Sequence, residues 1–369
     1  MYFAGFLLVL GPLITLHELG HYLVGRWFGV QAEAFSVGFG KEIWGRTDRH
    51  GTRWRLSALP LGGYVQFKGD MNPASVPDRD APVESGSFQH AALWKRALIV
   101  AAGPVMNLLI AIGIFFAYNV AYGERQPVDP QEVGVIAGFT EDSRAAAAGF
   151  EVGDRIVALD GKTYANQQEI QAEIFAHPNR EFRVTVMRGG QERNFTVVAA
   201  PNELEDGFGN PMNVGLIGVR FNEIEERFQP LGLGQSLTRA FVQCYEITDM
   251  MVTGIAQIVT GDRSIKELGG PIKIAKYSGE RLSLGMTEFV FFAALISLNL
   301  AFINFLPIPA LDGGHLAFYA AEAVRGNPVG AEATEWAYRG GIALVLMFML
   351  IVTVNDVTSL ANFGALFGS

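Results

Sequence analysis

Residues 1–25 read MYFAGFLLVLGPLITLHELGHYLVG, and their only side chains that ionise near neutral pH are His17, Glu18 and His21. A helix needs roughly 20 apolar residues to cross a bilayer, so this stretch is long enough to span one. The alternative is a cleaved signal peptide. Such a peptide has a basic leader and a small-residue cleavage site. This stretch shows neither, so we predict a first transmembrane helix over residues 1–28.

Three further apolar runs predict three more spans. Residues 97–123 and 289–310 contain no Asp, Glu, Lys or Arg, and residues 340–355 form a shorter uncharged run. Only 18% of the 369 residues are charged, whereas soluble domains carry about 25%. The sequence is therefore typical of an α-helical membrane protein that crosses the bilayer about four times.

Composition also excludes some classes of partner and site. The net charge is −9, so the chain lacks the basic footprint of a nucleic-acid-binding protein. Cys244 is the only cysteine, which excludes an intrachain disulfide and a Cys-rich metal site. We expect the lipid bilayer and other membrane proteins, rather than nucleic acid, as partners.

The segments between the spans predict a β region and a separate outer domain. In the β region, Pro60-Leu61-Gly62-Gly63 predicts a turn between two strands of a hairpin, and residues 71–84 predict a surface loop. Farther along, residues 233–259 have helical periodicity and predict a helix that lies against the membrane or the bundle. The predicted order is a first span (1–28), a cytoplasmic or membrane-associated β region with a loop (29–90), a second span (91–123), an outer α+β domain (124–212), a membrane-proximal helical region (213–285), a third span with a Pro-rich segment (286–325) and a fourth span (334–362).

The positions of Lys and Arg predict the orientation in the membrane, because basic residues gather in cytoplasmic loops. No basic residue precedes Arg26, and none follows Arg339. Four spans then place the segment between the first two in the cytoplasm, with both termini and the outer domain on the other side. This segment carries ten basic residues: Arg26, Lys41, Arg46, Arg49, Arg53, Arg55, Lys68, Arg79, Lys95 and Arg96.

The pentapeptide HELGH at residues 17–21 predicts a zinc site. Helix residues at i and i+4 lie on the same face, so the two imidazoles can bind one ion, and Glu18 beside them can accept a proton from water. Ionisable groups are costly in an apolar span and mark functional sites. The alternative is a pair of polar residues that merely contact neighbouring helices.

A catalytic zinc ion usually has three protein ligands and one open position. The third ligand is predicted to be Asp312 or His315, in NFLPIPALDGGH at residues 304–315. The prolines break the helix, and irregular backbone at membrane depth is tolerated where it lines a wet cavity. The alternative is a span that simply ends at a Pro-rich turn.

Together, HELGH at residues 17–21 and NFLPIPALDG at residues 304–313 resemble the site-2 protease family of intramembrane zinc metalloproteases (peptidase family M50). The chain is most similar to the bacterial branch of the regulator-of-sigma-E protease, which cleaves anti-sigma factors. FSVGFG at residues 35–40 and PLGGYV at residues 60–65 resemble its membrane-associated β-hairpin. GPVMN at residues 103–107 resembles a motif of its second span.

The resemblance implies an endopeptidase that uses Zn2+, and it assigns roles to individual residues. It implies His17, His21 and Asp312 as zinc ligands and Glu18 as the general base, with His315 outside the ligand set. Asn304 is implied to assist catalysis. The implied substrate contacts are Asn299, Gly38, Phe39 and Gly40.

The outer domain resembles a PDZ domain through AGFEVGDRI at residues 148–156. Relatives carry one or two such domains, and the resemblance implies a gate for substrates; a passive cap is the alternative. Implied substrates are single-span membrane proteins such as anti-sigma factors, cleaved in the bacterial inner membrane with both termini and the PDZ-like domain in the periplasm. Because a substrate helix must unwind before hydrolysis, a strand edge could pair with it; residues 37–40 or 56–59 are predicted to supply that edge.

Two other functions fit parts of the sequence. A non-enzymatic membrane adaptor would use the PDZ-like domain, but it would need neither the HELGH motif nor the distant Asp312. A metal transporter would be expected to show paired half-helices and several buried charges, which the sequence does not suggest. The protease is therefore the leading prediction.

Overall fold

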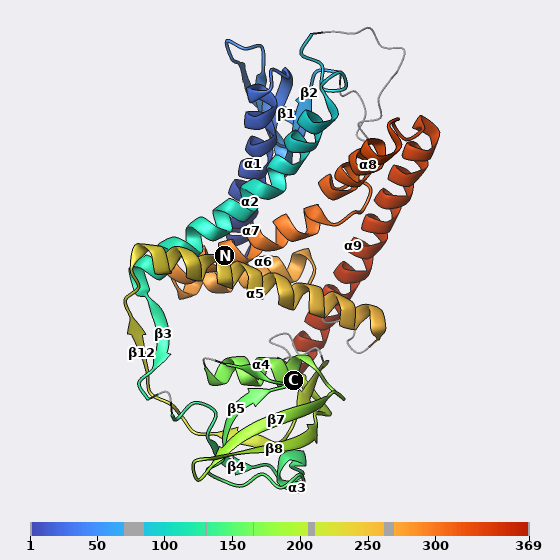
Figure 1. The fold of residues 1–369 in the computed structure, drawn as a ribbon. Coiled ribbons are helices and arrows are strands. Elements are labelled where there is room, and N and C mark those ends of the chain that lie inside the picture. Colours follow the sequence, from blue (N-terminus) through green and yellow to red (C-terminus); the bar gives the residue numbers. More distant parts are fainter. Residues whose placement is uncertain are drawn as a thin grey trace. The chain divides into compact units, whose positions relative to one another are not determined.

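The computed structural model describes residues 2–69, 85–129, 131–164, 166–205, 211–261 and 269–367 (Figure 1). They form two compact units. The first unit takes in residues 1–117, 237–248 and 269–356, and the second takes in residues 118–236, 249–268 and 357–369. The predicted loop at residues 71–84 lies outside the described residues.

The first unit is mainly helical. Four of the described helices are long and apolar enough to cross a membrane, and their positions agree with the four predicted spans. The third predicted segment is divided, because its helix ends at Phe305 and a new helix begins at Asp312. The helices that build this unit are α1 (Tyr2–Trp27), α2 (Leu93–Tyr122, in part), α5 (Leu233–Thr260, in part), α6 (Pro271–Leu284), α7 (Met286–Phe305), α8 (Asp312–Arg325) and α9 (Ala331–Phe367, in part).

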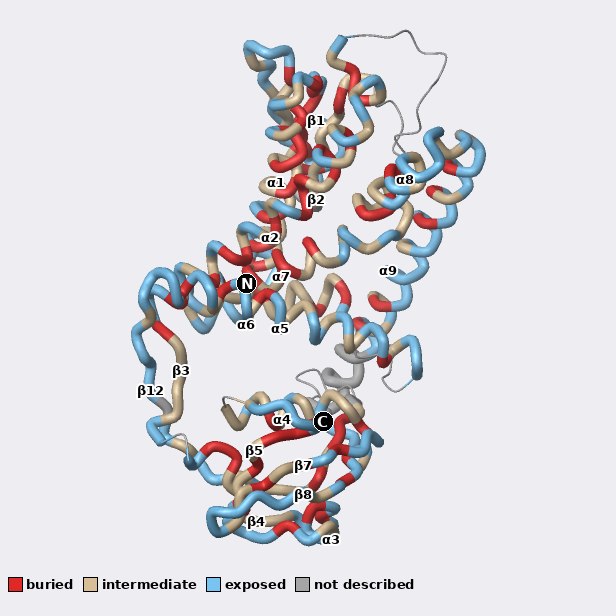
Figure 2. The backbone as a smooth tube through the Cα atoms, in the orientation of Figure 1, coloured by how far each residue is buried: buried red, intermediate tan, exposed pale blue. Residues whose placement is uncertain are grey.

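Helix α7 joins the helices of this unit. Phe289 of α7 packs in one apolar cluster with Val9 of α1. Leu298 of α7 packs in another with Phe115 of α2 and Cys244 of α5. By contrast, α9 is exposed along much of its length (Figure 2). Its exposed residues include large apolar ones such as Leu346 and Leu350. A helix with exposed apolar side chains fits contact with lipid.

Strands β1 (Ala32–Thr47) and β2 (Arg53–Phe67) form one sheet, in which both strands bend. As a result, residues 34–37 pair with residues 63–66 on one side and with residues 53–56 on the other. Residues 53–56 also pair with residues 44–47. Within the described chain, this leaves residues 63–67 with a strand partner on one side only.

The turn predicted at residues 60–63 is confirmed as a reversal of the chain: residues 53–56 run parallel to residues 34–37, whereas residues 63–66 run antiparallel to them. Among the described residues, these two segments lie on opposite sides of residues 34–37, so they do not pair with each other as a hairpin. The prediction that free strand edges begin at residues 37 and 56 is wrong. Val37 pairs with both Gly63 and Leu56, and Leu56 pairs with both Val37 and Trp44, so both positions lie inside the sheet.

The second unit contains the α+β domain, whose centre is an antiparallel sheet with strand order β6-β5-β7-β8. Phe182 and Val184 of β7 are fully buried against Ile170 of α4. Gly189 and Gly190 form the turn of the hairpin that joins β7 to β8. The elements are β3 (Glu124–Pro127), β4 (Ile136–Phe139), α3 (Arg144–Ala147), β5 (Arg155–Leu159), β6 (Lys162–Thr163), α4 (Gln167–Ala176), β7 (Glu181–Arg188), β8 (Gln191–Val198), β9 (Ala200–Glu205), β10 (Pro211–Leu216), β11 (Val219–Phe221) and β12 (Glu226–Gln229).

The predicted boundary of this domain at residue 212 is wrong. Residues 211–229, which were assigned in large part to a helical region, form β10, β11 and β12. β10 pairs with β9, β11 with β4, and β12 with β3, so the chain returns to strands formed about 90 residues earlier. The helix predicted at residues 233–259 is confirmed as α5.

A buried ion pair ties two strands of the domain together. Arg188, at the end of β7, donates hydrogen bonds to both carboxylate oxygens of Asp154, just before β5, each at 2.6 Å. Burial raises the pKa of Asp154, but the bonds from Arg188 and from the backbone N–H of Glu151 outweigh it, so the net pKa lies below its usual range. The carboxylate therefore stays charged at neutral pH.

Candidate metal centre

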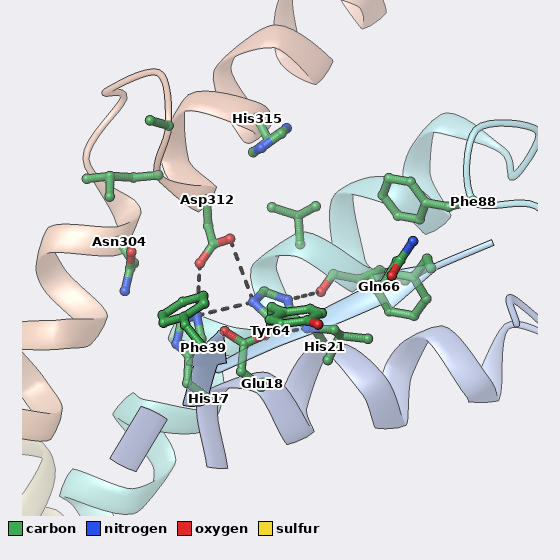
Figure 3. Close-up of a pocket in the computed structure, with 16 residues that line it drawn as sticks. His17, Glu18, His21, Phe39, Tyr64, Gln66, Phe88, Asn304, Asp312 and His315 are labelled. Atoms are coloured by element: carbon green, nitrogen blue, oxygen red, sulfur yellow. Dashed lines mark hydrogen bonds and ion pairs between the residues drawn. The ribbon is translucent and has the colours of Figure 1, made fainter. Parts of the chain in front are cut away.

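Three side chains meet where α1 faces the start of α8. His17 and His21 lie one turn apart on α1, and their Nε2 atoms are 3.2 Å from each other. Asp312 Oδ2 lies 3.1 Å from His17 Nε2, and Asp312 Oδ1 lies 3.6 Å from His21 Nε2 (Figure 3). The three ligand atoms lie within 4.8 Å of one another. The structure thus brings together the three predicted zinc ligands.

The Pro-rich segment explains how a carboxylate reaches this position. Helix α7 ends at Phe305, and Pro307 and Pro309 cannot continue it, because each lacks a backbone N–H. The chain then turns back so closely that a side chain at Gly313 or Gly314 would meet backbone carbonyl oxygens of residues 305–308. This tight turn lets α8 begin at Asp312, with its carboxylate facing the imidazoles.

Helix α2 holds the far side of both imidazole rings. His21 Nδ1 lies 2.8 Å from the carbonyl oxygen of Ile99, and His17 Nδ1 lies 3.1 Å from the side-chain amide of Asn107. Asn107 is fully buried, and its backbone carbonyl accepts a hydrogen bond from Ser297 of α7. Partners of this kind fix the ring orientation and tautomer of metal-binding histidines.

One buried atom tests whether these residues fit a metal. Asn107 Oδ1 is buried without a hydrogen-bond partner among the described residues when Nδ2 faces His17. A metal on His17 Nε2 would put the ring proton on Nδ1. If the amide is then turned over, Oδ1 accepts this proton, and the unsatisfied atom gains its partner. The residues therefore fit zinc held by two Nε2 atoms and one carboxylate.

Gly103 of α2 leaves the space that the two rings occupy. A Cβ atom there would lie 2.2 Å from His21 Nε2 and 2.7 Å from His17 Nε2. We expect Gly103→Ala to displace the imidazoles and weaken zinc binding by about 10–100-fold, the range for changes to groups that support metal ligands. Zinc affinity measured by competition with a chelator checks this.

Gly113→Ala is the matched control, because it lies on the same helix and its Cβ would meet nothing within 4 Å. Alanine favours the helix over glycine by about 1 kcal/mol. Helix propensity therefore cannot explain a loss of zinc in the Gly103 variant. Equal zinc affinity in both variants would contradict the role of Gly103.

Glu18 faces a cavity of about 600 Å³ next to the three ligands (Figure 3). Its Oε2 accepts a hydrogen bond of 3.1 Å from the backbone N–H of Val65, in the outer segment of the β1–β2 sheet. This bond holds the carboxylate on the side of α1 that faces the cavity. Glu18 is thus placed to act on water beside the ligands.

The other predicted site residues divide into two groups. Asn304 and Phe39 line the cavity, as does His315, whose Nδ1 lies 2.5 Å from the hydroxyl of Tyr338 and which is not in the ligand cluster. Among the described residues, Asn299 and the two glycines Gly38 and Gly40 are not in the cavity lining. The glycines have φ values of +90° and +87° and shape the bend of β1.

Several supporting groups were not predicted. The GPVMN motif at residues 103–107 drew attention to Gly103 and Asn107, but gave neither of them a role. The carbonyl of Ile99 and the N–H of Val65 are backbone groups. Every residue carries such groups, so no signal in the sequence could single them out.

Comparison with known proteins bears on the whole chain. Residues 5–348 match peptidase family M50. A predicted zinc metalloprotease of Agrobacterium fabrum is 41% identical over 369 residues, covering 97% of this chain and 96% of the relative. Another, from Rhizobium meliloti, is 42% identical over 360 residues, covering 95% of each chain.

A solved PDZ domain of an SdrC-like protein from Listeria monocytogenes covers 24% of this chain and 87% of its own, with 19% identity and a TM-score of 0.20. That score is too low to carry an argument, so the PDZ-like character of the outer domain rests on its sequence motif. The family match and the two relatives extend over nearly the whole sequence. The chain is therefore a zinc metalloprotease and belongs to peptidase family M50.

Proposed function

We propose that this protease cleaves single-span membrane proteins, of the anti-sigma-factor type, within or beside the bilayer. The observation that carries the proposal is the position of the metal cluster. His17 and His21 lie on a helix apolar enough to span a membrane, and both are buried. A site on such a helix favours substrates that are themselves in the membrane.

The side chains of the cavity have separate proposed roles in hydrolysis. Bound zinc would be held by His17, His21 and Asp312, and supplies a Lewis acid that activates water and polarises the scissile carbonyl. Glu18 accepts the proton of the attacking water and returns it to the leaving amine. Asn304 lines the same cavity, and its amide is proposed to donate a hydrogen bond to the carbonyl oxygen of the substrate.

The orientation is proposed from charge. The ten basic residues from Arg26, at the end of α1, to Arg96, near the start of α2, favour a cytoplasmic position for the β1–β2 sheet. Both termini and the PDZ-like domain then lie in the periplasm of a bacterial inner membrane. From there the PDZ-like domain is proposed to limit which substrates reach the catalytic site.

The substrate backbone is proposed to pair with residues 63–67 of β2. These residues have a strand partner on one side, among the described strands. Tyr64 and Val65 also line the cavity, and the N–H of Val65 points to Glu18. An extended segment of substrate added at this edge would cross the cavity beside the general base. The ring of Phe39 is stacked on the ring of Tyr64, with 6.1 Å between their centres. Phe39 would therefore contact side chains of the bound substrate.

Reconstituted protein tests both proposals. The full chain, loaded with zinc in lipid vesicles, is expected to cut a single-span substrate tagged at both ends. Val65→Pro removes the N–H that holds Glu18 and distorts the open edge of β2, so it should lower the cleavage rate by about tenfold, the effect of one hydrogen bond of roughly 1.4 kcal/mol, while zinc content stays unchanged.

Ile43→Pro is the control, because residue 43 lies within a register irregularity of β1, where proline is tolerated. Equal rates for the two proline variants would refute pairing at residues 63–67. If the wild-type protein, with zinc bound, cuts soluble proteins but no membrane substrate, the proposed substrate class is wrong.

A further inference from the structure

The metal cluster has two halves that come from distant parts of the sequence. Helix α1 supplies the imidazoles, and α2 holds them through Ile99 and Asn107. Helix α8 supplies the carboxylate of Asp312. The ligand atoms stay within 4.8 Å of one another only while α8 keeps its place against α2. A contact between these two helices therefore controls the geometry of the site.

A buried ion pair makes such a contact. Arg96, near the start of α2, donates a hydrogen bond of 2.8 Å through Nη2 to Glu322 Oε1 of α8. The two side chains are 10% and 17% exposed. Arg96 Nε also donates to the carbonyl of Ala91, and the guanidinium lies 5.0 Å from the centre of the Tyr319 ring. A planar guanidinium held by a carboxylate, a carbonyl and an aromatic face has little freedom to move.

The place of this pair along each helix connects it to the site. Arg96 lies three residues before Ile99, so it sits about one turn from the carbonyl that holds His21. Glu322 lies ten residues after Asp312, about 15 Å along α8. Tyr319, which lies between Asp312 and Glu322 on α8, packs in the same apolar cluster as Ile99 of α2. The pair and this cluster thus hold α8 against α2, with Asp312 at the N-terminal end of the helix.

We propose that Arg96 and Glu322 are a positioning pair, which holds α8 against α2 and so sets the distance from the Asp312 carboxylate to the two imidazoles. Neither residue touches the metal position. Their effect is on zinc affinity, through the geometry of the ligands. The proposal does not depend on the identity of the substrate.

The test measures zinc affinity of the full chain in detergent by competition with a chelator. Glu322→Gln keeps the size of the side chain but removes its charge, and should weaken zinc binding by about 10–100-fold, with helix content by circular dichroism unchanged. Glu335→Gln is the matched control, since it breaks the exposed pair with Arg339 on α9. This control should bind zinc like the wild type.

Two further variants separate positioning from general stability. Arg96→Lys keeps the charge but loses the planar fork, and a smaller loss of zinc affinity is expected; it decides the test if Glu322→Gln does not fold. The exchange Arg96→Glu with Glu322→Arg should recover most of the affinity lost by Glu322→Gln. Wild-type zinc affinity in both single variants, or an exchange that recovers nothing, would overturn the proposal. Because no substrate is present, failure of the proposed substrate class cannot mimic these results.

Discussion

Glu18→Gln is expected to abolish measurable cleavage while the protein keeps its zinc. The amide of glutamine matches the carboxylate in size and can still meet the N–H of Val65 through its oxygen. It cannot accept a proton from water. Loss of a general base lowers a rate by about 10²–10⁴-fold. Metal analysis and the vesicle assay, made on the same preparation, measure both properties.

The control for this variant is Glu33→Gln, at a carboxylate of β1 that is exposed and does not line the cavity. It should retain both zinc and the wild-type rate. If Glu18→Gln lost its zinc together with its activity, Glu18 would be part of the metal site instead of the base. If it cleaved at the wild-type rate, another group would have to accept the proton.

Asp312→Ala is expected to lose zinc, and cleavage with it. The carboxylate is one of the three groups in the cluster, so its removal should cost more than the roughly 100-fold that marks the upper range for supporting residues. Chelator competition with the wild-type protein measures the loss. The apolar helices do not depend on this side chain, so helix content should not change.

His315→Gln distinguishes the two candidates for the third ligand. His315 lies one turn after Asp312 and lines the cavity, but its Nδ1 is engaged by Tyr338 and it is outside the cluster. This variant should keep stoichiometric zinc. If Asp312→Ala kept its zinc and His315→Gln lost it, His315 and not Asp312 would be the third ligand.

The sequence predicts the helices of this protein well, because an uncharged run of about 20 residues has few stable alternatives to a spanning helix. It predicts the ligands well for a different reason. His17 and His21 share one helix face by spacing alone. Asp312 was open against His315 on spacing and was singled out only by resemblance to a family, and the structure then placed it beside the imidazoles.

The errors lie where contacts cross long stretches of sequence. β11 and β12 are short, and their partners β4 and β3 are formed about 90 residues earlier, so no local pattern reveals the pairing. The turn predicted at residues 60–63 does reverse the chain, but residues 53–56 and 63–66 then flank residues 34–37 instead of pairing with each other, which no local pattern reveals. The role of Asn107 is apparent only in the folded structure, because it depends on the position of His17.

The distance along the chain between the two halves of the metal site determines when, during synthesis, the ligand set becomes complete. His17 and His21 are made early, but the Asp312 carboxylate is synthesised almost 300 residues later. Metal binding and folding are coupled when the ligands are brought together only in the folded state. The growing chain therefore passes through most of its synthesis with no complete ligand set, and it cannot hydrolyse a peptide bond with zinc-activated water before Asp312 has been added.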